Sequence, residues 1–397
     1  MDPRTNPYAP GAGTPPPELA GRDNAIEQAA VALDRIREGR AARSLIFYGL
    51  RGVGKTVLLN RIRVDAEARG ILAVRMEAPE ERSLPALLAP PLRAALLRLD
   101  RGKAIKAAGR RALSALAGFA SSLKLKYQDI ELGIDVPTEK GLADSGDLDN
   151  DLGELIAAVG EAAAEHKTAI VLYLDELQYV SEYELAALIM ALHNATSQNQ
   201  LPITMVAAGL PQLLGRMGRA KSYSERLFEF VSIGRLDADA ATAALCVPAE
   251  KEGATFAAAA ITEILTKTHC YPYFLQEWGK HSWNVADRSP IDVQDALDAT
   301  QRAIAELDAS FFRVRFDRLT PSEKRYMRAM AELGPGPHRS GEVAELLRKK
   351  VTGTAPTRNA LIAKGMIFSP SHGDTAFTVP LFDGFMKRTI PDFTSKR

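Results

Sequence analysis

Five short apolar runs recur along the first part of the chain. They occupy residues 44–48, 71–76, 169–174, 203–208 and 228–233. A continuous apolar run of this length is typical of a strand that is covered on both faces, as the strands of a parallel sheet are. Segments with a helical spacing of apolar residues separate the runs. This alternation predicts an α/β fold with helices on both faces of the sheet.

The stretch between the second and third runs is longer than a usual crossover and predicts an insertion at residues 84–165. Within it, residues 84–99 and 103–123 have the spacing of amphipathic helices. Residues 122–136 alternate between polar and apolar positions, which indicates a hairpin. An acidic turn region then leads into another predicted helix.

The regions on either side of the predicted sheet differ from it. Residues 1–17 are rich in Pro and Gly without an apolar core, so we expect a flexible lead-in rather than a secretory signal. The alanine-rich sequence of residues 238–315 predicts a set of helices. Residues 316–397 predict a separate domain that opens with a capping box, in which Thr320 and Glu323 lie three positions apart.

Composition narrows the class of protein. The 397 residues suffice for two or three domains, and the formal net charge of +1 means that any nucleic-acid contact needs a local basic patch. Cys246 and Cys270 are in no C-x-x-C pair, so neither a zinc site nor a disulfide framework is expected. No apolar run is long enough to span a bilayer, which predicts a cytoplasmic protein without a membrane partner.

The first apolar run leads into GLRGVGKT, residues 49–56, which matches G-x-x-x-x-G-K-[ST] between a strand and a helix. Glycines let backbone N–H groups turn inward around phosphate oxygens, and the helix N-terminus adds its positive dipole end. Lys55 is expected to reach the β- and γ-phosphates of ATP, and Thr56 to bind Mg²⁺. The loop residues expected to contact ATP are Gly49, Leu50, Arg51, Gly52, Val53, Gly54, Lys55, Thr56 and Val57.

The third apolar run ends in two adjacent acids. Asp175 emerges where parallel strands place their ligands, and it is expected to bind Mg²⁺ directly or through water. Glu176 is the candidate general base for the attacking water. Gln178 is either a further residue that orients this water or a solvated loop residue. The pair of acids favours an ATPase over a kinase.

These ordered motifs resemble an AAA+ ATPase of the origin-recognition and archaeal-ATPase branch, close to the signalling (STAND) ATPases. The resemblance implies a P-loop NTPase sheet with a helical lid, at residues 18–237 and 238–315. It places Arg22, in the segment ELAGRDNAIEQA, by the adenine, and Pro272 and Tyr273, in THCYPYFLQEW, at the nucleotide from the lid. Asp23 is a plausible N-cap for the helix that follows.

Two departures from the family pattern, and one further motif, bear on hydrolysis. The fourth run ends in Ala207, Ala208 and Gly209 where the family often has a polar sensor. Cys270 replaces the usual Gly of the lid segment. Arg226, just before the fifth run, resembles the arginine that reaches the nucleotide of a neighbouring subunit. The alternative is a surface arginine paired with Glu225 or Glu229.

Residues 316–397 have the order of elements of a winged-helix domain, with a recognition helix at 354–365 and a wing that turns at His372 and Gly373. This domain is the candidate contact to double-stranded DNA. The candidate DNA-binding residues are Arg339, Lys349, Lys350, Thr357, Arg358, Asn359 and Lys364. The alternative is a winged helix that contacts protein.

The sequence therefore predicts an ATP-binding, slowly hydrolysing Mg²⁺-dependent AAA+ switch that acts on DNA through its winged helix, either alone or as a homo-oligomer with Arg226 acting in trans. Two alternatives stay open. The first is a STAND-like signalling or defence ATPase whose winged helix binds protein. The second is a nucleotide binder with little turnover.

Overall fold

The computed structural model describes residues 1–11, 13–78, 82–99, 106–124, 138–222 and 224–393. They form two compact units. One contains residues 22–49 and 55–233, and the other contains residues 1–21, 50–54 and 234–397. Most of the hairpin predicted at 122–136 lies outside the described residues. Within the described part of the chain, no helix is both long and apolar enough to cross a membrane.

The first unit is built on a five-stranded parallel sheet in the order β2-β3-β4-β1-β5. Each predicted strand is confirmed to within one residue at either end. The strands are β1 Ser44–Tyr48, β2 Leu72–Glu77, β3 Ile170–Asp175, β4 Ile203–Gly209 and β5 Phe228–Ser232. The interior strands β3 and β4 are buried along their whole length, which explains their continuous apolar sequence.

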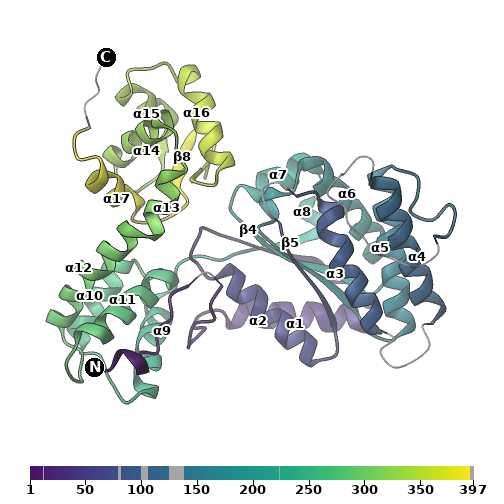
Figure 1. The fold of residues 1–397 in the computed structure, drawn as a ribbon, viewed down its shortest axis with the longest axis horizontal. Helices are drawn as coiled ribbons and strands as arrows, with labels where there is room; N and C mark the ends of the chain where they lie inside the picture. The colour runs from purple at the N-terminus through teal and green to yellow at the C-terminus, as the bar shows by residue number, and fades with distance from the viewer. Residues whose placement is uncertain (12, 79–81, 100–105, 125–137, 223, 394–397) are drawn as a thin grey trace. The chain divides into compact units, whose positions relative to one another are not determined.

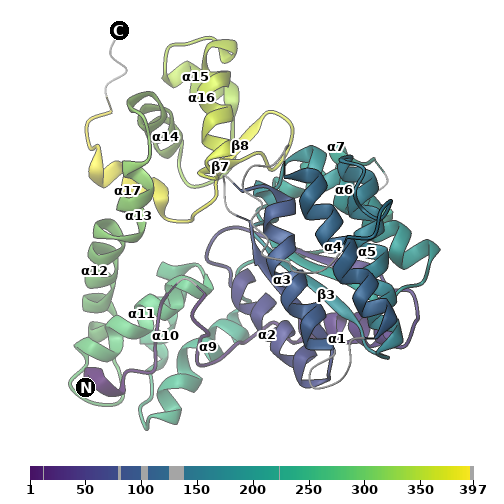
Figure 2. The same ribbon diagram turned by 45° about the vertical axis from the view of Figure 1, so that its right-hand side comes forward.

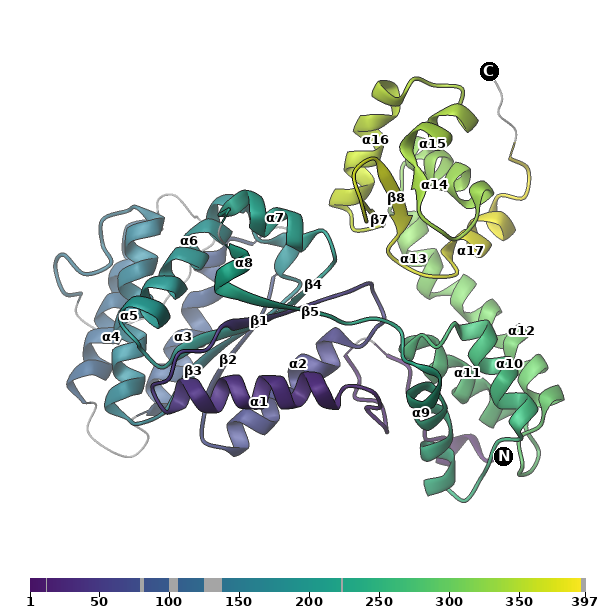
Figure 3. The same ribbon diagram turned by 180° about the vertical axis from the view of Figure 1, so that it is seen from behind.

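Helices cover both faces of this sheet (Figures 1 and 3). One face carries α1 Asp23–Arg37 and α2 Lys55–Ala68. The other carries α3 Leu84–Leu99, α4 Ala107–Leu123, α5 Leu148–Glu165 and α6 Glu182–His193. The short helices α7 Leu213–Ala220 and α8 Ser224–Leu227 lead into β5.

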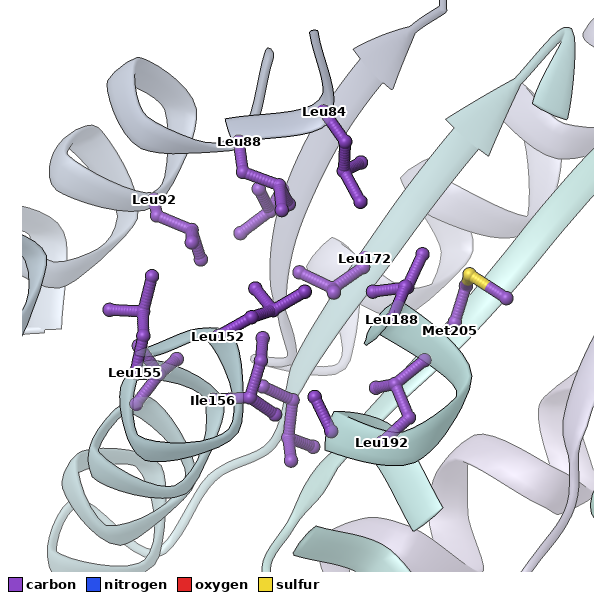
Figure 4. Close-up of a cluster of buried hydrophobic side chains, with 14 of the residues drawn as sticks. Leu84, Leu88, Leu92, Leu152, Leu155, Ile156, Leu172, Leu188, Leu192 and Met205 are labelled. Carbon is purple, nitrogen blue, oxygen red and sulfur yellow. The ribbon is translucent and has the colours of Figure 1, made fainter. Parts of the chain in front are cut away.

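The insertion is an integral part of the hydrophobic core. Leu88 of α3, Leu152 of α5, Leu172 of β3 and Leu188 of α6 are all buried and point toward one another (Figure 4). Burying a leucine side chain contributes roughly 1.5–3 kcal/mol to the free energy of folding. Helices α3 and α5 therefore stabilise the sheet in addition to α6. The N-cap prediction at α1 is wrong, because Arg22 occupies the cap position and Asp23 is the first helical residue.

The second unit contains the predicted helical lid. It consists of α9 Ala238–Lys251, α10 Ala258–Thr268, α11 Pro272–Val285, α12 Val293–Ala309 and α13 Phe311–Asp317. The C-terminal segment follows with α14 Pro321–Leu333, β6 His338–Arg339, α15 Ser340–Leu346, α16 Val351–Ala363, β7 Ile367–Phe368, β8 Asp374–Phe377 and α17 Phe382–Thr389. The expected capping box of Thr320 and Glu323 is present at the start of α14.

The C-terminal strands form a small antiparallel sheet in the order β6-β8-β7. Figure 2 shows β7 and β8 of this sheet. The turn between β7 and β8 includes Gly373, whose φ of 82° lies in the left-handed region that glycine adopts without strain. The sequence predicted the β7–β8 hairpin but not β6, because a two-residue strand leaves no alternation to detect. Helix α16 begins three residues earlier than the predicted helix.

The prediction of a flexible lead-in is wrong, because the N-terminal segment is held against the lid. Tyr8 is 4% exposed, and its hydroxyl donates to the carbonyl of Leu245 in α9. Asn6 donates to the carbonyl of Lys280 at 3.0 Å, and the indole of Trp283 donates to the carbonyl of Asp2 at 2.8 Å. A Cβ added at Gly279 would lie 2.6 Å from the Tyr8 ring, so the glycine makes room for this contact.

Candidate functional site

The carboxyl ends of three neighbouring strands meet at one edge of the sheet. In the order β3-β4-β1, these ends are Asp175, Gly209 and Tyr48, and the next residue, Gly49, donates its N–H to the carbonyl of Gly209 at 3.2 Å. Ligands of open α/β sheets bind outside such an edge. The two sequence motifs are therefore brought together at the place where the fold provides a ligand site.

The loop after β1 has the backbone expected of the glycine motif. Gly52 and Gly54 have φ values of 84° and 88°, in the region that only glycine enters freely. Lys55 opens α2, and its buried ammonium donates to the carbonyl of Gly49 at 2.9 Å. The lysine is thus folded over the loop whose phosphate-binding role the sequence predicts.

The two predicted metal ligands are in direct contact. The hydroxyl of Thr56 donates to Asp175 Oδ2 at 2.6 Å, while Asp175 Oδ1 accepts from the backbone N–H of Glu176 at 2.8 Å. Burial raises the pKa of the Asp175 carboxyl, and the Thr56 hydrogen bond opposes this shift. A hydroxyl and a buried carboxylate at a strand end are donors that suit Mg²⁺, because this cation prefers oxygen ligands.

Glu176 has an unusual backbone, with φ 53° and ψ 35° in the left-handed region. Such a conformation costs a non-glycine residue of the order of 1–3 kcal/mol and is concentrated at functional sites. It turns the chain into the short 3-10 helix Leu177–Tyr179 and brings Gln178 back toward Glu176.

Gln178 is buried rather than solvated, and its amide connects two parts of the site. Its Nε2 donates to Glu176 Oε2, and its Oε1 accepts from the backbone N–H of Leu210 at 2.9 Å. Leu210 directly follows β4, where the family pattern led us to look for a polar sensor. The sequence left two roles open for Gln178, because its partner, the backbone N–H of Leu210, gives no signal in the sequence. Thr204 lies at the opposite end of β4, against Ser44 at 3.0 Å.

In the second unit, the lid approaches the loop residues 50–54. The N–H of Tyr273 donates to the carbonyl of Gly52 at 3.2 Å, and a Cβ at Gly52 would lie 3.2 Å from the Tyr273 Cβ. Pro272 is the first residue of α11, directly before Tyr273. Cys270 has a φ of 57°, which explains in physical terms why glycine is usual there. Tyr273 therefore contacts the loop that is expected to bind ATP, and its contact with the nucleotide itself stays a prediction.

Arg22 and Arg226 are the two remaining residues that are predicted to contact a nucleotide, and they differ in burial. Arg22 is buried at the start of α1. Arg226 is exposed and precedes β5, whose first residue Phe228 pairs with Ser44 at the amino end of β1. Arg226 therefore lies at the edge of the sheet opposite Gly49. Glu229 contacts Gln28 and Arg43 instead of Arg226.

Of the predicted DNA-binding residues, two are engaged within the domain. Arg358 donates to the Thr375 hydroxyl at 2.9 Å and to the Asp374 carbonyl at 2.9 Å, so it fastens the β7–β8 hairpin to α16. Lys364 pairs with Glu323 at 2.7 Å. Both cations therefore have oxygen partners within the domain, and their contact with DNA stays a prediction.

The other five predicted DNA-binding residues are more accessible. Arg339 is largely exposed and lies 3.2 Å from Asp374. Lys349 and Lys350 are exposed directly before α16, and Asn359 is exposed on that helix. Thr357 lines a small surface pocket together with Tyr326 and Lys349. The accessible basic groups therefore lie around the start of α16 rather than along it.

The sheet and the loop define a P-loop NTPase fold with a five-stranded parallel sheet. Residues 18–206 match the family described as the AAA ATPase domain, and this part of the chain belongs to that family of ATP-binding ATPases. Residues 309–386 match a family described as a domain of unknown function. A search of the curated proteins gave no match.

Solved structures resemble most of the chain. A Walker-type ATPase of Pyrococcus abyssi has 15% identity and a TM-score of 0.59, with 94% of this chain and 97% of that chain covered. The Orc1 protein of Aeropyrum pernix in complex with DNA has 15% identity, a TM-score of 0.45 and 94% coverage of both chains. A RuvB mutant of Thermotoga maritima has 14% identity, a TM-score of 0.45 and coverage of 90% and 92%.

Proposed function

We propose that the chain is a Mg²⁺-dependent ATPase that turns over slowly and works as a nucleotide-controlled switch. The observation that carries this proposal is the contact between Thr56 and Asp175 at 2.6 Å, beside Lys55 and Glu176 at the carboxyl edge of the sheet. A hydroxyl, a carboxylate, an ammonium and a second carboxylate are the groups that ATP hydrolysis needs from a protein.

The residues divide this work among them. The N–H groups of residues 49–57 bind phosphate oxygens, and Lys55 moves from the Gly49 carbonyl to the β- and γ-phosphates. Thr56 and Asp175 hold Mg²⁺, which supplies positive charge to the phosphates when it is bound. Glu176 accepts the proton of the attacking water. Arg22, Pro272 and Tyr273 contact the base.

Slow turnover is supported by the end of β4. Its last residues, Ala207, Ala208 and Gly209, have no polar side chains. No side chain from the end of β4 therefore senses the γ-phosphate.

Two variants test this proposal directly. Lys55→Ala should lose ATP binding and turnover, because no other ammonium opens α2. Glu176→Gln should bind ATP as tightly as the native chain but leave it uncleaved. Arg61→Ala, which removes an exposed arginine paired with Asp65 on the same helix, should change neither property. Unchanged ATP affinity in Lys55→Ala would show that the nucleotide site is elsewhere.

We also propose that residues 316–397 form a winged-helix domain that carries the output of the switch to DNA. Three helices followed by an antiparallel hairpin support this assignment. Lys349 and Lys350, both exposed at the N-terminus of α16, are the residues best placed for phosphate contacts, with Arg339, Thr357 and Asn359 around them.

One observation favours a second candidate, in which this domain binds protein. Arg358 is the only charged residue of α16, and it is engaged by the hairpin. The exposed positions of the helix include Val351, Pro356, Asn359 and Ala363, which present a largely uncharged surface. A helix that enters a DNA groove normally carries several basic or polar groups on that surface.

A further inference from the structure

Two neighbouring lid helices bring together three side chains that the proposed ATPase reaction does not use. Glu277 and His281 are four residues apart on α11, and this spacing puts both side chains on one face of the helix. Glu306 faces them from α12, which packs beside α11. All three belong to the second unit.

Their donor atoms converge on one point. His281 Nε2 lies 3.1 Å from Glu306 Oε2 and 3.9 Å from Glu277 Oε2, and the three donor atoms all lie within 4.8 Å of one another. A tetrahedral cation with bonds of about 2.0–2.1 Å holds its ligand atoms roughly 3.3–3.4 Å apart. The distance from His281 Nε2 to Glu306 Oε2 is slightly shorter than this value, and the distance to Glu277 Oε2 is slightly longer.

Two of these atoms are buried without a hydrogen-bond partner in the described part of the chain. They are Glu277 Oε2 and His281 Nε2, on residues that are 4% and 7% exposed. The contact of His281 with Glu306 lacks hydrogen-bond geometry. Leaving buried polar atoms unpaired costs about 1–3 kcal/mol for each group. A cation between them would satisfy both atoms at once.

The charge of the cluster also leaves room for a cation. Lys280 lies 2.7 Å from Glu306 Oε1 and 3.9 Å from Glu277 Oε2, so one ammonium faces two carboxylates. With His281 neutral and both carboxylates ionised, the three side chains and Lys280 together carry one negative charge, and Arg302 of α12 is a second cation that acts on His281. The Lys280 side chain is 28% exposed, so it can swing out into solvent.

We propose that Glu277, His281 and Glu306 form a binding site for a divalent transition-metal cation of the Zn²⁺ class. One imidazole nitrogen and two carboxylate oxygens are donors that suit Zn²⁺, and three protein ligands leave the fourth position to water. Mg²⁺ is a poor occupant, because it prefers an all-oxygen shell. The expectation of no zinc site came from cysteine spacing, and a Glu-x-x-x-His pair completed by another helix escapes that criterion.

The site is joined to the nucleotide loop through one side chain. Glu277 Oε1, the oxygen turned away from the cluster, accepts from the Tyr273 hydroxyl at 2.9 Å, and the N–H of Tyr273 donates to Gly52. Such outer partners orient metal ligands and are part of the site. The proposal concerns metal binding alone and does not depend on the proposed ATPase activity.

The test is metal binding by the full chain without nucleotide. Equilibrium dialysis against Zn²⁺ should show a single saturable high-affinity cation per chain. Co²⁺ in its place should give the strong visible absorption of a tetrahedral complex, and Mg²⁺ should not displace it. His281→Gln should weaken Zn²⁺ binding at least about 10-fold, because loss of even an outer-shell partner costs that much.

Two further variants separate the site from other effects. Glu263→Gln removes a lid carboxylate that pairs with Lys267 at 3.6 Å away from the cluster, and it should leave Zn²⁺ affinity unchanged. Lys280→Met should tighten binding, because it removes the competing ammonium. The proposal is overturned if the native chain gives no tetrahedral Co²⁺ absorption, or if folded His281→Gln binds Zn²⁺ as tightly as the native chain. If His281→Gln does not fold, weaker or unchanged binding by Lys280→Met overturns it instead.

Discussion

Glu176 shows how one residue combines strain with function. Its left-handed backbone is unfavourable, yet it lets the amide of Gln178 reach both the Glu176 carboxylate and the N–H of Leu210. Strain of this kind persists only where the surrounding contacts over-determine the conformation. We therefore interpret Gln178 as the residue that fixes the orientation of the proposed general base.

This interpretation predicts the effect of Gln178→Ala. The variant should bind ATP normally but hydrolyse it roughly 10-fold more slowly or worse, because a small misplacement of a catalytic group is costly. Steady-state turnover should be measured beside the equilibrium affinity for ATP.

A matched control separates this effect from a general loss of stability. Gln198→Ala removes an exposed glutamine from the same unit and should leave turnover unchanged. A Gln178→Ala chain with native turnover, or one that loses ATP affinity and turnover together, would contradict a positioning role.

At the scale of whole elements, tertiary packing orders the N-terminal segment, which the sequence alone predicts to be flexible. Tyr8 is buried against Gly279 of α11, and its hydroxyl donates a hydrogen bond to Leu245 of α9. Tyr8→Ala should therefore lower the free energy of unfolding of the lid by about 3–5 kcal/mol, the range measured when a buried aromatic side chain is truncated to alanine. Urea unfolding and the rate of proteolysis near the N-terminus would detect this change.

Tyr8→Phe is the control for this prediction. It keeps the ring against Gly279 and loses only the hydrogen bond to Leu245, so its destabilisation should be much smaller, about 1 kcal/mol. Equal stability of Tyr8→Ala and the native chain would mean that the segment adds nothing to the lid.

Much of the sheet and of the phosphate loop could be predicted from the sequence, because both rest on local patterns. The buried strands β3 and β4 have continuous apolar runs, and the loop motif fixes both its glycines and its lysine. Contacts between distant segments could not be predicted in this way. Tyr8 meets Leu245, and Gln178 meets Leu210, only because of tertiary packing. The sequence likewise gives no sign that Arg358 donates to the β7–β8 hairpin.

At the scale of the whole molecule, net charge limits how the chain can recognise nucleic acid. A protein with a formal charge of +1 gains little from non-specific attraction, so DNA binding would depend on the few accessible cations around α16. If residues 316–397 act on DNA, Lys349→Ala combined with Lys350→Ala should weaken duplex binding by the full chain and reduce its salt dependence by about two counterions.

The comparison variant is Arg358→Ala, which alters an arginine held inside the domain. It should lower thermal stability more than it changes the slope of log affinity against log salt concentration. Titrations with a duplex at several salt concentrations provide both quantities. Absence of binding at low salt would exclude the DNA role and favour a protein partner on the uncharged surface of α16.

Assembly is the remaining property of the whole molecule, and Arg226 allows it to be tested. The parallel pairing of β5 with β1 puts Arg226 at the amino edge of the sheet, so it is remote from Gly49 of its own chain. If Arg226 assists hydrolysis, it does so at the site of a neighbouring copy, where its planar fork can contact two phosphate oxygens. Turnover per chain should then rise with protein concentration, and Arg226→Ala should abolish that rise.

Mixing two impaired variants gives the sharpest test of action in trans. Glu176→Gln chains lack the base but still offer Arg226, whereas Arg226→Ala chains keep the base and lack the arginine. In a mixed assembly, the intact base of one chain faces the intact arginine of the other, so turnover should exceed that of either variant alone at the same total concentration. Arg43→Ala alters an exposed arginine near the same edge and replaces Arg226→Ala in a control mixture. Its turnover should equal that of the native chain. Simple additivity in the mixture, together with native turnover of Arg226→Ala at every concentration, would make Arg226 an ordinary surface charge.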